Sequence, residues 1–340
     1  MAGAGVVTPR YDEPDPASFD RPRRRTRPRT KERPTYDDAV DGFVVTVDRG
    51  RYTVRVQPEG EDERTITAMK SRPLGRKGVV VGDRVRVVGD VSGVEDTLAR
   101  IVEVAERETV LRRTADDDDK VERILVANAE QLVIVTAVAN PEPRPRLIDR
   151  ALVAAYDAGL DPLLVLTKVD LADPADLLAT YRPLGVASVV AERGGDLDPV
   201  RDWLRNRVSV FIGHSGVGKS TLVNALVPGA TRAVGHVNEV TGRGRHTSTS
   251  ALALELPFGG WVVDTPGIRS FGLAHVDPGD LIHAFDDLSA LTVDCPRGCT
   301  HGESEPECAL DDAVADGRVD AERVESFRRL LASRERTDGD

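Results

Sequence analysis

The chain has 340 residues, a formal net charge of −11 and 40% hydrophobic residues. This length predicts two or three domains, whose cores must be built from Val, Leu and Ala because only 4% of residues are aromatic. We find no apolar run of about 18 residues that would span a membrane, and no apolar segment of a secretory signal near the first residue. We therefore expect a cytoplasmic protein without a membrane partner. Its acidic balance alone argues against nucleic acid.

The first 37 residues depart from that average charge. Seven Arg and one Lys lie between Arg21 and Arg33, against a single acid, Glu32. The stretch lacks hydrophobic periodicity and is rich in Pro, which predicts disorder. Such an arm would bind phosphate backbones without sequence preference, or it is a solvated linker that contacts nothing. Both interpretations stay open.

Short β-rich runs follow and predict a small closed barrel of five strands, an OB-fold. A hairpin across Asp48-Arg49-Gly50 joins the first two runs. The segment 69–78 is basic and lies between strands, so we favour RNA contact there over a solvated loop. The expected strands cover 42–47, 52–56, 65–68, 79–88 and 98–104.

A phosphate-binding P-loop is the strongest signal in the chain. Residues 213–220 read Gly-x-x-x-x-Gly-Lys-Ser between an apolar strand, 208–212, and a helical segment. Glycines let the backbone wrap a triphosphate with its N–H groups pointing inward. Lys219 would reach the β- and γ-phosphates, and Ser220 would hold Mg²⁺. The predicted nucleotide-binding residues here are Gly213, His214, Ser215, Gly216, Val217, Gly218, Lys219, Ser220 and Thr221.

A second motif lies upstream of the P-loop, in an α/β region that begins near Val121. Buried strands are predicted over 131–138 and 162–166, with a helix over 146–158. Thr167-Lys168-Val169-Asp170 follows the second strand and resembles the Asn-Lys-x-Asp guanine-reading motif of GTPases. The Asp170 carboxylate would accept N1–H and N2–H of guanine, which adenine does not offer. A further loop for guanine would follow Val190-Ala191.

A third motif, Asp264-Thr265-Pro266-Gly267, follows the predicted strand 260–263. Asp264 would hold Mg²⁺ through water, and the N–H of Gly267 would bind the γ-phosphate. Residues 242–249 lie where a switch I loop belongs. The guanine motif comes about 45 residues before the P-loop, whereas ordinary GTPases place it last, so the sequence predicts a circularly permuted GTPase.

These motifs together resemble the small-ribosomal-subunit-dependent GTPase family RsgA, also called YjeQ. The resemblance rests on 213–224, 244–249 and 264–273 and covers about 40–330. It implies an OB-fold, a permuted GTPase domain and a C-terminal zinc domain. It also implies action in late maturation of the 30S subunit, with that subunit and its 16S rRNA as partners, and GTP hydrolysed to GDP. We expect a monomer.

The resemblance also suggests the catalytic residues. Ile268 stands where Ras-like GTPases have a glutamine and cannot orient water, which predicts slow turnover without a partner. His246 is then the candidate water-positioning residue, beside Lys219; a structural or RNA-facing role for His246 is the alternative. Thr247 or Thr249 would complete the Mg²⁺ site with Ser220.

All three cysteines of the chain lie within fourteen residues, together with one histidine. The set Cys295, Cys299, His301 and Cys308 offers a complete tetrahedral Cys₃His site, which predicts one structural Zn²⁺ ion rather than a catalytic one. The loops between the ligands differ in length from those of the family. Free buried cysteines are the alternative interpretation.

The C-terminal region also contains an amphipathic helical segment. Its arginines, among them Arg323 and Arg328, would form a second RNA-contact surface, or the helix packs on the GTPase domain with a solvated outer face. The sequence thus predicts an arm over 1–37, an OB-fold over 38–114, a permuted GTPase domain over 115–274 and a helical zinc domain over 275–340.

Two rivals to a subunit-triggered GTPase stay open. An ATP-dependent phosphotransferase uses the same P-loop, and an RNA-binding scaffold uses slow hydrolysis as a timer. Competition binding of GTP against ATP distinguishes the phosphotransferase from a GTPase. A hydrolysis assay with and without small subunits distinguishes the scaffold from a subunit-triggered GTPase.

Overall fold

A computed structural model of the chain describes residues 36–75, 78–113, 122–230, 251–265, 273 and 275–335. The arginine-rich arm, the acidic break 115–120 and the expected switch segment 242–249 lie outside these residues. Within the described part, no helix is both long and apolar enough to cross a membrane.

The first five strands form the predicted barrel. They pair in the order β1-β2-β3-β5-β4, and β4 pairs again with β1, which closes the ring. Alternate side chains such as Val54, Ile66 and Ile101 fill the interior and are almost fully buried. The strands are β1 (Val40–Asp48), β2 (Arg51–Val56), β3 (Arg64–Lys70), β4 (Arg84–Gly89) and β5 (Ala99–Val104), with a short 3₁₀ helix η2 (Arg72–Leu74) after β3.

The barrel confirms the hairpin between β1 and β2 but shortens the fourth strand. Arg49 and Gly50 both have positive φ, as a tight two-residue turn requires. The strand expected over 79–88 begins only at Arg84, because Gly82 turns the chain with φ near +88° and the buried Asp83 carboxylate accepts the N–H of Val80 at 2.8 Å.

The central region is an open α/β sheet. Its strands lie in the order β10-β9-β8-β11-β13-β12, all parallel except β12. They are β8 (Gln131–Ala137), β9 (Asp161–Thr167), β10 (Ala187–Ala191), β11 (Val208–Ile212), β12 (Leu252–Glu255) and β13 (Trp261–Asp264). Its helices are α1 (Pro145–Asp157), α2 (Ala175–Tyr181), α3 (Asp198–Leu204) and α4 (Lys219–Leu226), with a 3₁₀ helix η3 (Arg182–Leu184).

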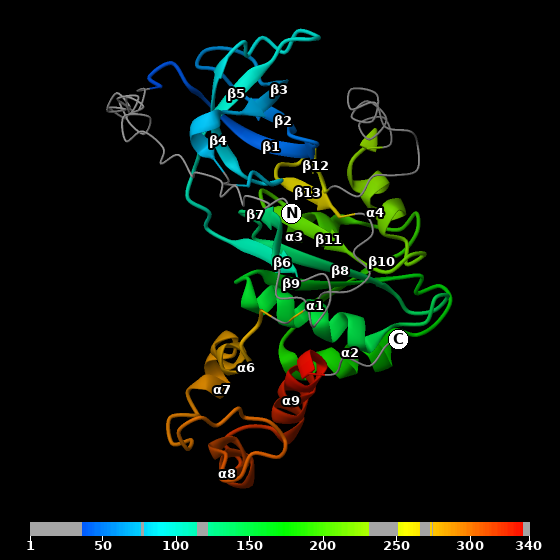
Figure 1. The fold of residues 1–340 in the computed structure, drawn as a ribbon. Helices are drawn as coiled ribbons and strands as arrows, with labels where there is room; N and C mark the ends of the chain where they lie inside the picture. The colour runs from blue at the N-terminus through cyan, green and yellow to red at the C-terminus, as the bar shows by residue number, and fades with distance from the viewer. Residues whose placement is uncertain are drawn as a thin grey trace, which may run out of the picture. The chain divides into compact units, whose positions relative to one another are not determined.

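Two apolar cores lie on the two faces of this sheet. Alternate residues of β8 divide between them, with Leu132 and Ile134 in one core and Val133 and Val135 in the other. Every residue of β8 is buried, as expected of a parallel strand covered on both faces. In Figure 1 the strand ends that carry the predicted motifs meet where β11 leads into α4.

A hairpin that the sequence analysis missed precedes the sheet. Strands β6 (Val110–Arg113) and β7 (Arg123–Ala127) pair antiparallel across the acidic break. Both strands are short, and two of the four residues of β6 are arginines, so alternation of apolar and polar residues gives little evidence of a strand here. The expected domain boundary between residues 114 and 115 falls between these two paired strands and stays a prediction.

The C-terminal region is made of short helices. The apolar face of its last helix, including Phe327 and Leu330, is buried in the core that also contains α1. The elements are α6 (Pro278–Leu281), η4 (Ile282–Ala284), α7 (Asp286–Ser289), α8 (Ala309–Ala315) and α9 (Ala321–Glu335).

The described arginines of α9 are held within the molecule. Arg323 pairs with Asp287 at 2.7 Å and donates to the Pro183 carbonyl at 2.8 Å. Arg329 donates to the carbonyl of Thr180 at 3.3 Å, and the Nε of Arg334 donates to the Val276 carbonyl at 2.6 Å. The interpretation in which this helix packs on the GTPase domain therefore describes the structure, and Arg336 lies outside the described residues.

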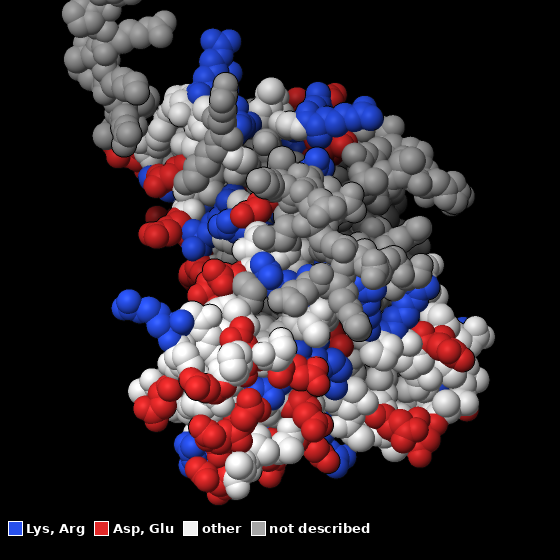
Figure 2. All heavy atoms as spheres, turned by 60° about the horizontal axis from the view of Figure 1, so that its bottom comes forward, with Lys and Arg blue, Asp and Glu red and all other residues white. Residues whose placement is uncertain are grey.

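The exposed surface of this region is acidic. Between residues 286 and 325, eleven Asp and Glu residues are exposed, against two arginines, Arg297 and Arg318. Figure 2 shows red side chains outnumbering blue ones on the face that carries these elements. A surface of this sign does not suit a phosphate backbone.

Candidate functional site

The P-loop joins the end of β11 to the start of α4. Gly216 and Gly218 have φ of +85° and +93°, a region that favours glycine. A Cβ at Gly213 would stand 2.5 Å from the carbonyl oxygen of Val135 on β8. The three glycines are therefore required for different reasons. Gly216 and Gly218 allow the backbone to turn, and Gly213 allows the loop to lie against strand β8.

Gly213→Ala tests this close approach. We expect a loss of about 1–3 kcal/mol in the free energy of unfolding, since the methyl group meets backbone rather than a flexible side chain, and at least tenfold weaker nucleotide binding because the loop must shift. Thermal unfolding and nucleotide titration measure the two effects. Gly78→Ala is the matched control, because a Cβ there meets nothing within 4 Å and its φ is ordinary. Equal behaviour of the two variants would contradict the interpretation.

Lys219 and Asp264 meet at the phosphate side of the loop. The Lys219 ammonium contacts Oδ1 of Asp264, which ends β13. The two motifs lie 45 residues apart in sequence, and the parallel pairing of β11 with β13 sets Phe211 level with Asp264. The Thr265 hydroxyl fixes this end of β13 by donating to the Phe211 carbonyl at 2.9 Å. Of the predicted phosphate and magnesium ligands, Lys219 and Asp264 thus lie in direct contact.

The guanine motif is joined directly to the P-loop. Thr167 ends β9, is buried, and its hydroxyl donates to the carbonyl oxygen of Val217 at 2.5 Å. Thr167 stands where the related motif has Asn, and its single O–H makes this link. Asp170 is exposed at the edge of the sheet, in a turn closed by the Leu171 N–H to the Lys168 carbonyl at 2.9 Å.

Two segments lie beside this motif, and the one at Asn140 carried no clear signal in the sequence. Lys168, with φ of +56°, extends its ammonium to the carbonyl of Asn140, in the loop between β8 and α1. On the other side, β10 pairs with β9 so that Ala191 lies level with Thr167. The loop after Val190-Ala191 therefore begins beside the guanine motif, as the sequence analysis expected.

Five predicted site residues cannot be placed. His246, Thr247, Thr249, Gly267 and Ile268 all lie outside the described residues. Their roles stay predictions.

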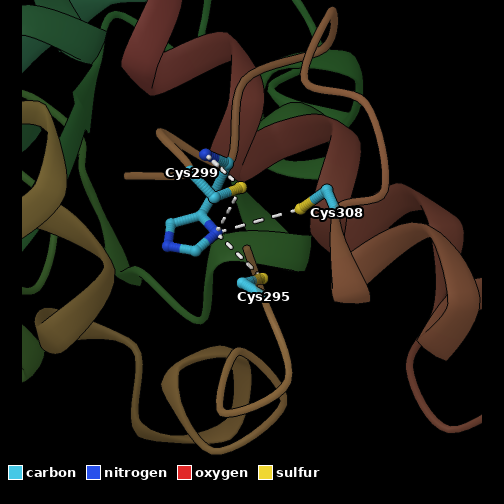
Figure 3. A group of neighbouring side chains, drawn as sticks. Cys295, Cys299 and Cys308 are labelled. Atoms are coloured by element: carbon cyan, nitrogen blue, oxygen red, sulfur yellow. Dashed lines mark hydrogen bonds between the residues drawn. The ribbon is translucent and has the colours of Figure 1, made fainter. Parts of the chain in front are cut away.

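A second cluster lies between α7 and α8, where Cys295, Cys299, His301 and Cys308 come together. Their ligand atoms all lie within 4.8 Å of one another. Figure 3 shows the three sulfurs around one imidazole nitrogen, Nδ1 of His301, at 3.5, 3.5 and 3.8 Å for Cys295, Cys299 and Cys308. His301 reaches this position with φ of +61°.

These distances fit a tetrahedral metal ion. Zinc bonds of about 2.3 Å to sulfur and 2.0–2.1 Å to nitrogen place a sulfur and a nitrogen ligand about 3.6 Å apart at tetrahedral angles. Burial raises the pKa of the Cys295 thiol and raises that of Cys299 to about 11, while it lowers the pKa of His301. Burial makes ionisation of these thiols unfavourable, and a bound cation would offset that cost by favouring the thiolates. The pKa directions alone favour neutral thiols, and it is the convergence of the four ligand atoms that suits a cation.

Helix α9 braces this cluster through an arginine. The guanidinium of Arg328 donates to both carboxylate oxygens of Asp311 at 2.7 and 3.1 Å and to the His301 carbonyl at 3.2 Å. The N–H groups of His301 and Ala309 also point at sulfurs, each at 3.4 Å. A basic RNA-contact surface was one of two interpretations of Arg328 from the sequence, and neither included this bracing role.

Comparison with known proteins decides the family. A sequence profile of the family described as RsgA GTPase matches residues 104–274, half of the chain. A small ribosomal subunit biogenesis GTPase RsgA from Chlorobaculum parvum is 37% identical over 308 residues, which cover 87% of this chain and 99% of that protein. The chain belongs to the RsgA GTPase family.

Other RsgA relatives are more similar over a shorter stretch. The RsgA protein of Ectopseudomonas mendocina is 46% identical over 218 residues, and the match spans 62% of this chain and 63% of that protein. Similar matches to proteins of Pseudomonas aeruginosa span 65% of their length. The first relatives are thus matched over less than two thirds of their own length.

Solved structures of the RsgA type share the fold. The crystal structure of YjeQ from Thermotoga maritima has a TM-score of 0.65 and 28% identity, covering 87% of this chain and 99% of that one. A structure titled YloQ, a circularly permuted GTPase, has a TM-score of 0.63 at 24% identity. The permuted order explains the sheet seen here, in which β8, β9 and β10 precede the P-loop strand β11 in the chain.

Proposed function

We propose that this chain is a GTP hydrolase that acts in late maturation of the 30S ribosomal subunit. It binds the subunit and its 16S rRNA, and it hydrolyses GTP to GDP and phosphate when docked. Membership of the RsgA family supports this role, as do the names of its relatives, small ribosomal subunit biogenesis GTPases. It would work in the cytoplasm as a monomer.

One observation carries the nucleotide part of the proposal. The Thr167 hydroxyl ties the guanine motif to the P-loop, while Lys219 meets Asp264 on the phosphate side. A single ligand with a guanine at one end and phosphates at the other would engage both ends of this arrangement. That is the shape of GTP.

Within this site each residue has a separate task. The amides of Gly213 to Thr221 and the Lys219 ammonium stabilise charge on the phosphates. Asp170 selects guanine, with the stem of Lys168 along the base and Thr167-Val169 as the supporting wall. The N–H of Gly267 would bind the γ-phosphate.

Two metals complete the proposal. Ser220, with Thr247 or Thr249, would hold Mg²⁺, and Asp264 would reach it through water; such an ion would supply positive charge to the phosphates. Cys295, Cys299, His301 and Cys308 would hold one structural Zn²⁺ ion, leaving no open position for a substrate.

Hydrolysis with and without isolated 30S subunits tests the function. We expect the rate of GTP hydrolysis to rise on adding subunits, and competition assays to show preference for GTP over ATP. A rate that subunits leave unchanged would support the scaffold with a slow timer. Equal affinity for ATP would support a phosphotransferase instead.

His246→Ala tests the water-positioning role. We expect a fall of about 10²-fold in the subunit-stimulated rate of hydrolysis, since phosphate stabilisation by the P-loop is retained while the water loses its orienting group. GTP affinity should stay within about twofold. His283→Ala is the comparison histidine, because His283 is exposed and lies outside the nucleotide site, and its stimulated rate should equal that of the parent chain. An unchanged stimulated rate in His246→Ala would remove His246 from the mechanism.

A further inference from the structure

The barrel and the nucleotide site are joined by a continuous row of paired backbone residues. Asp264 on β13 pairs with Leu252 on β12, and Leu252 pairs in turn with Thr46 on β1 of the barrel. The row continues through the barrel from Thr46 to Thr53 on β2. In Figure 1 the yellow strands β12 and β13 lie beside the blue strand β1.

The contact is reinforced at the other end of β13. The ring of Phe43, on β1, lies against the ring of Trp261 with centroids 4.8 Å apart and planes tilted by 31°. Trp261 is the first residue of β13 and Asp264 is the last. The first residue of this four-residue strand thus packs against Phe43 of the barrel, and its last residue carries the carboxylate that contacts Lys219.

The partner strand β12 is held by the barrel as well. Glu255 pairs with Trp261 across the two strands, and its carboxylate accepts from the Arg55 guanidinium of β2 at 3.0 Å. Exposed ion pairs of this kind contribute little energy. The aromatic contact is therefore the stronger of these two side-chain contacts, and ring pairs of this geometry contribute about 0.5–1.5 kcal/mol beyond the area they bury.

We propose that Phe43 is a positioning residue for the nucleotide site, acting through Trp261 on Asp264. β13 is clamped between β11, which leads into the P-loop, and the β12–β1 pair. A shift of β1 against β13 would move the Asp264 carboxylate relative to Lys219. This inference rests on the proposed function, in which Asp264 serves the magnesium ion and the γ-phosphate.

The coupling should distinguish GTP from GDP. Asp264 acts only on Mg²⁺ and the γ-phosphate, whereas GDP without magnesium uses the P-loop and the guanine motif. Loss of the Phe43 contact should therefore weaken Mg²⁺·GTP without weakening magnesium-free GDP. General destabilisation of the fold would weaken both nucleotides alike.

The test is nucleotide titration of the isolated full chain, with Mg²⁺·GTP and with GDP in the presence of EDTA. For Phe43→Ala we expect affinity for Mg²⁺·GTP to fall about five- to tenfold and affinity for GDP to stay within about twofold. Phe43→Tyr keeps the ring and should restore the value of the parent chain. Ile66→Val is the matched control, because Ile66 is buried in the barrel interior and belongs to a core separate from that of β13.

A second measurement covers the case in which Phe43→Ala folds poorly. Coupling between sites is reciprocal, so Mg²⁺·GTP should slow hydrogen exchange in β1 of the parent chain more than GDP does. Equal exchange of β1 in both states would overturn the inference, as would equal GTP affinity of Phe43→Ala and the parent chain. A fall in Mg²⁺·GTP affinity in Ile66→Val equal to that in Phe43→Ala would also overturn the inference. A parent chain that binds no GTP would overturn the proposed function, and this inference with it.

Discussion

We expect the Asp170→Asn protein to bind GTP about 10²- to 10³-fold more weakly than the parent chain and to gain affinity for xanthosine triphosphate. A carboxylate accepts two N–H groups of guanine, and hydrogen bonds to charged groups contribute about 1.5–3 kcal/mol each. The Asn amide keeps one acceptor and turns a donor toward the base. Xanthine has a carbonyl at that position, which accepts the new donor. Competition titration with the two nucleotides measures both changes.

Asp173→Asn is the matched control for this exchange. Asp173 is also exposed in the loop after β9, and its carboxylate accepts the N–H of Ala175 at 2.9 Å, a bond that an Asn side chain also makes. Its nucleotide preference should equal that of the parent chain. If Asp170→Asn also leaves the preference unchanged, the base is read elsewhere, and the loop after Ala191 becomes the next candidate.

Cys308→Ser should lose the metal and unfold the C-terminal region. Cys308 is almost fully buried and immediately precedes α8, so its sulfur connects the ligand loop to that helix. Binding of structural zinc contributes on the order of 10 kcal/mol in small metal domains, and much of this is folding free energy. We expect the parent chain to carry one zinc ion by elemental analysis and Cys308→Ser to carry none. Thermal unfolding should then show an early separate transition.

Ser304→Ala, an exposed residue in the same loop, is the control, and it should keep both the metal and the single transition. A parent chain without stoichiometric zinc would refute the structural metal. Retained zinc in Cys308→Ser would remove Cys308 from the ligand set. GTP affinity separates a local from a global effect, because the P-loop and the guanine motif belong to other elements and should survive.

Local motifs made most of the nucleotide site predictable. The P-loop carries its strand, its glycines and its helix within 20 residues, so the sequence placed all three correctly. The Thr167 bond to the Val217 carbonyl spans 50 residues and follows from the sheet order rather than from any local pattern. The same holds for Phe43 and Trp261, which lie more than 200 residues apart.

Charge patterns predicted the surface of the C-terminal region less well than local motifs predicted the P-loop. The sequence analysis considered a basic RNA-facing surface for the arginines of α9. In the structure Arg323 and Arg328 pair with Asp287 and Asp311, and Arg329 lies against Asp149 at 3.3 Å. Composition shows how many cations a helix carries, but only packing shows which of them an internal carboxylate has neutralised. The fourth strand of the barrel was predicted too long because its run of valines outweighed the local turn at Gly82 and Asp83.

The acidic face between residues 286 and 325 would bias the orientation of the molecule near a polyanion before any contact is made. Near an RNA-rich particle, the field of the phosphates would repel this face over roughly 8–10 Å, the Debye length at physiological salt. The resulting torque turns the C-terminal end away and presents another side first. The molecule would thus approach the particle in a preferred orientation. This preference should weaken as salt is added, just as electrostatically steered association rates fall with salt.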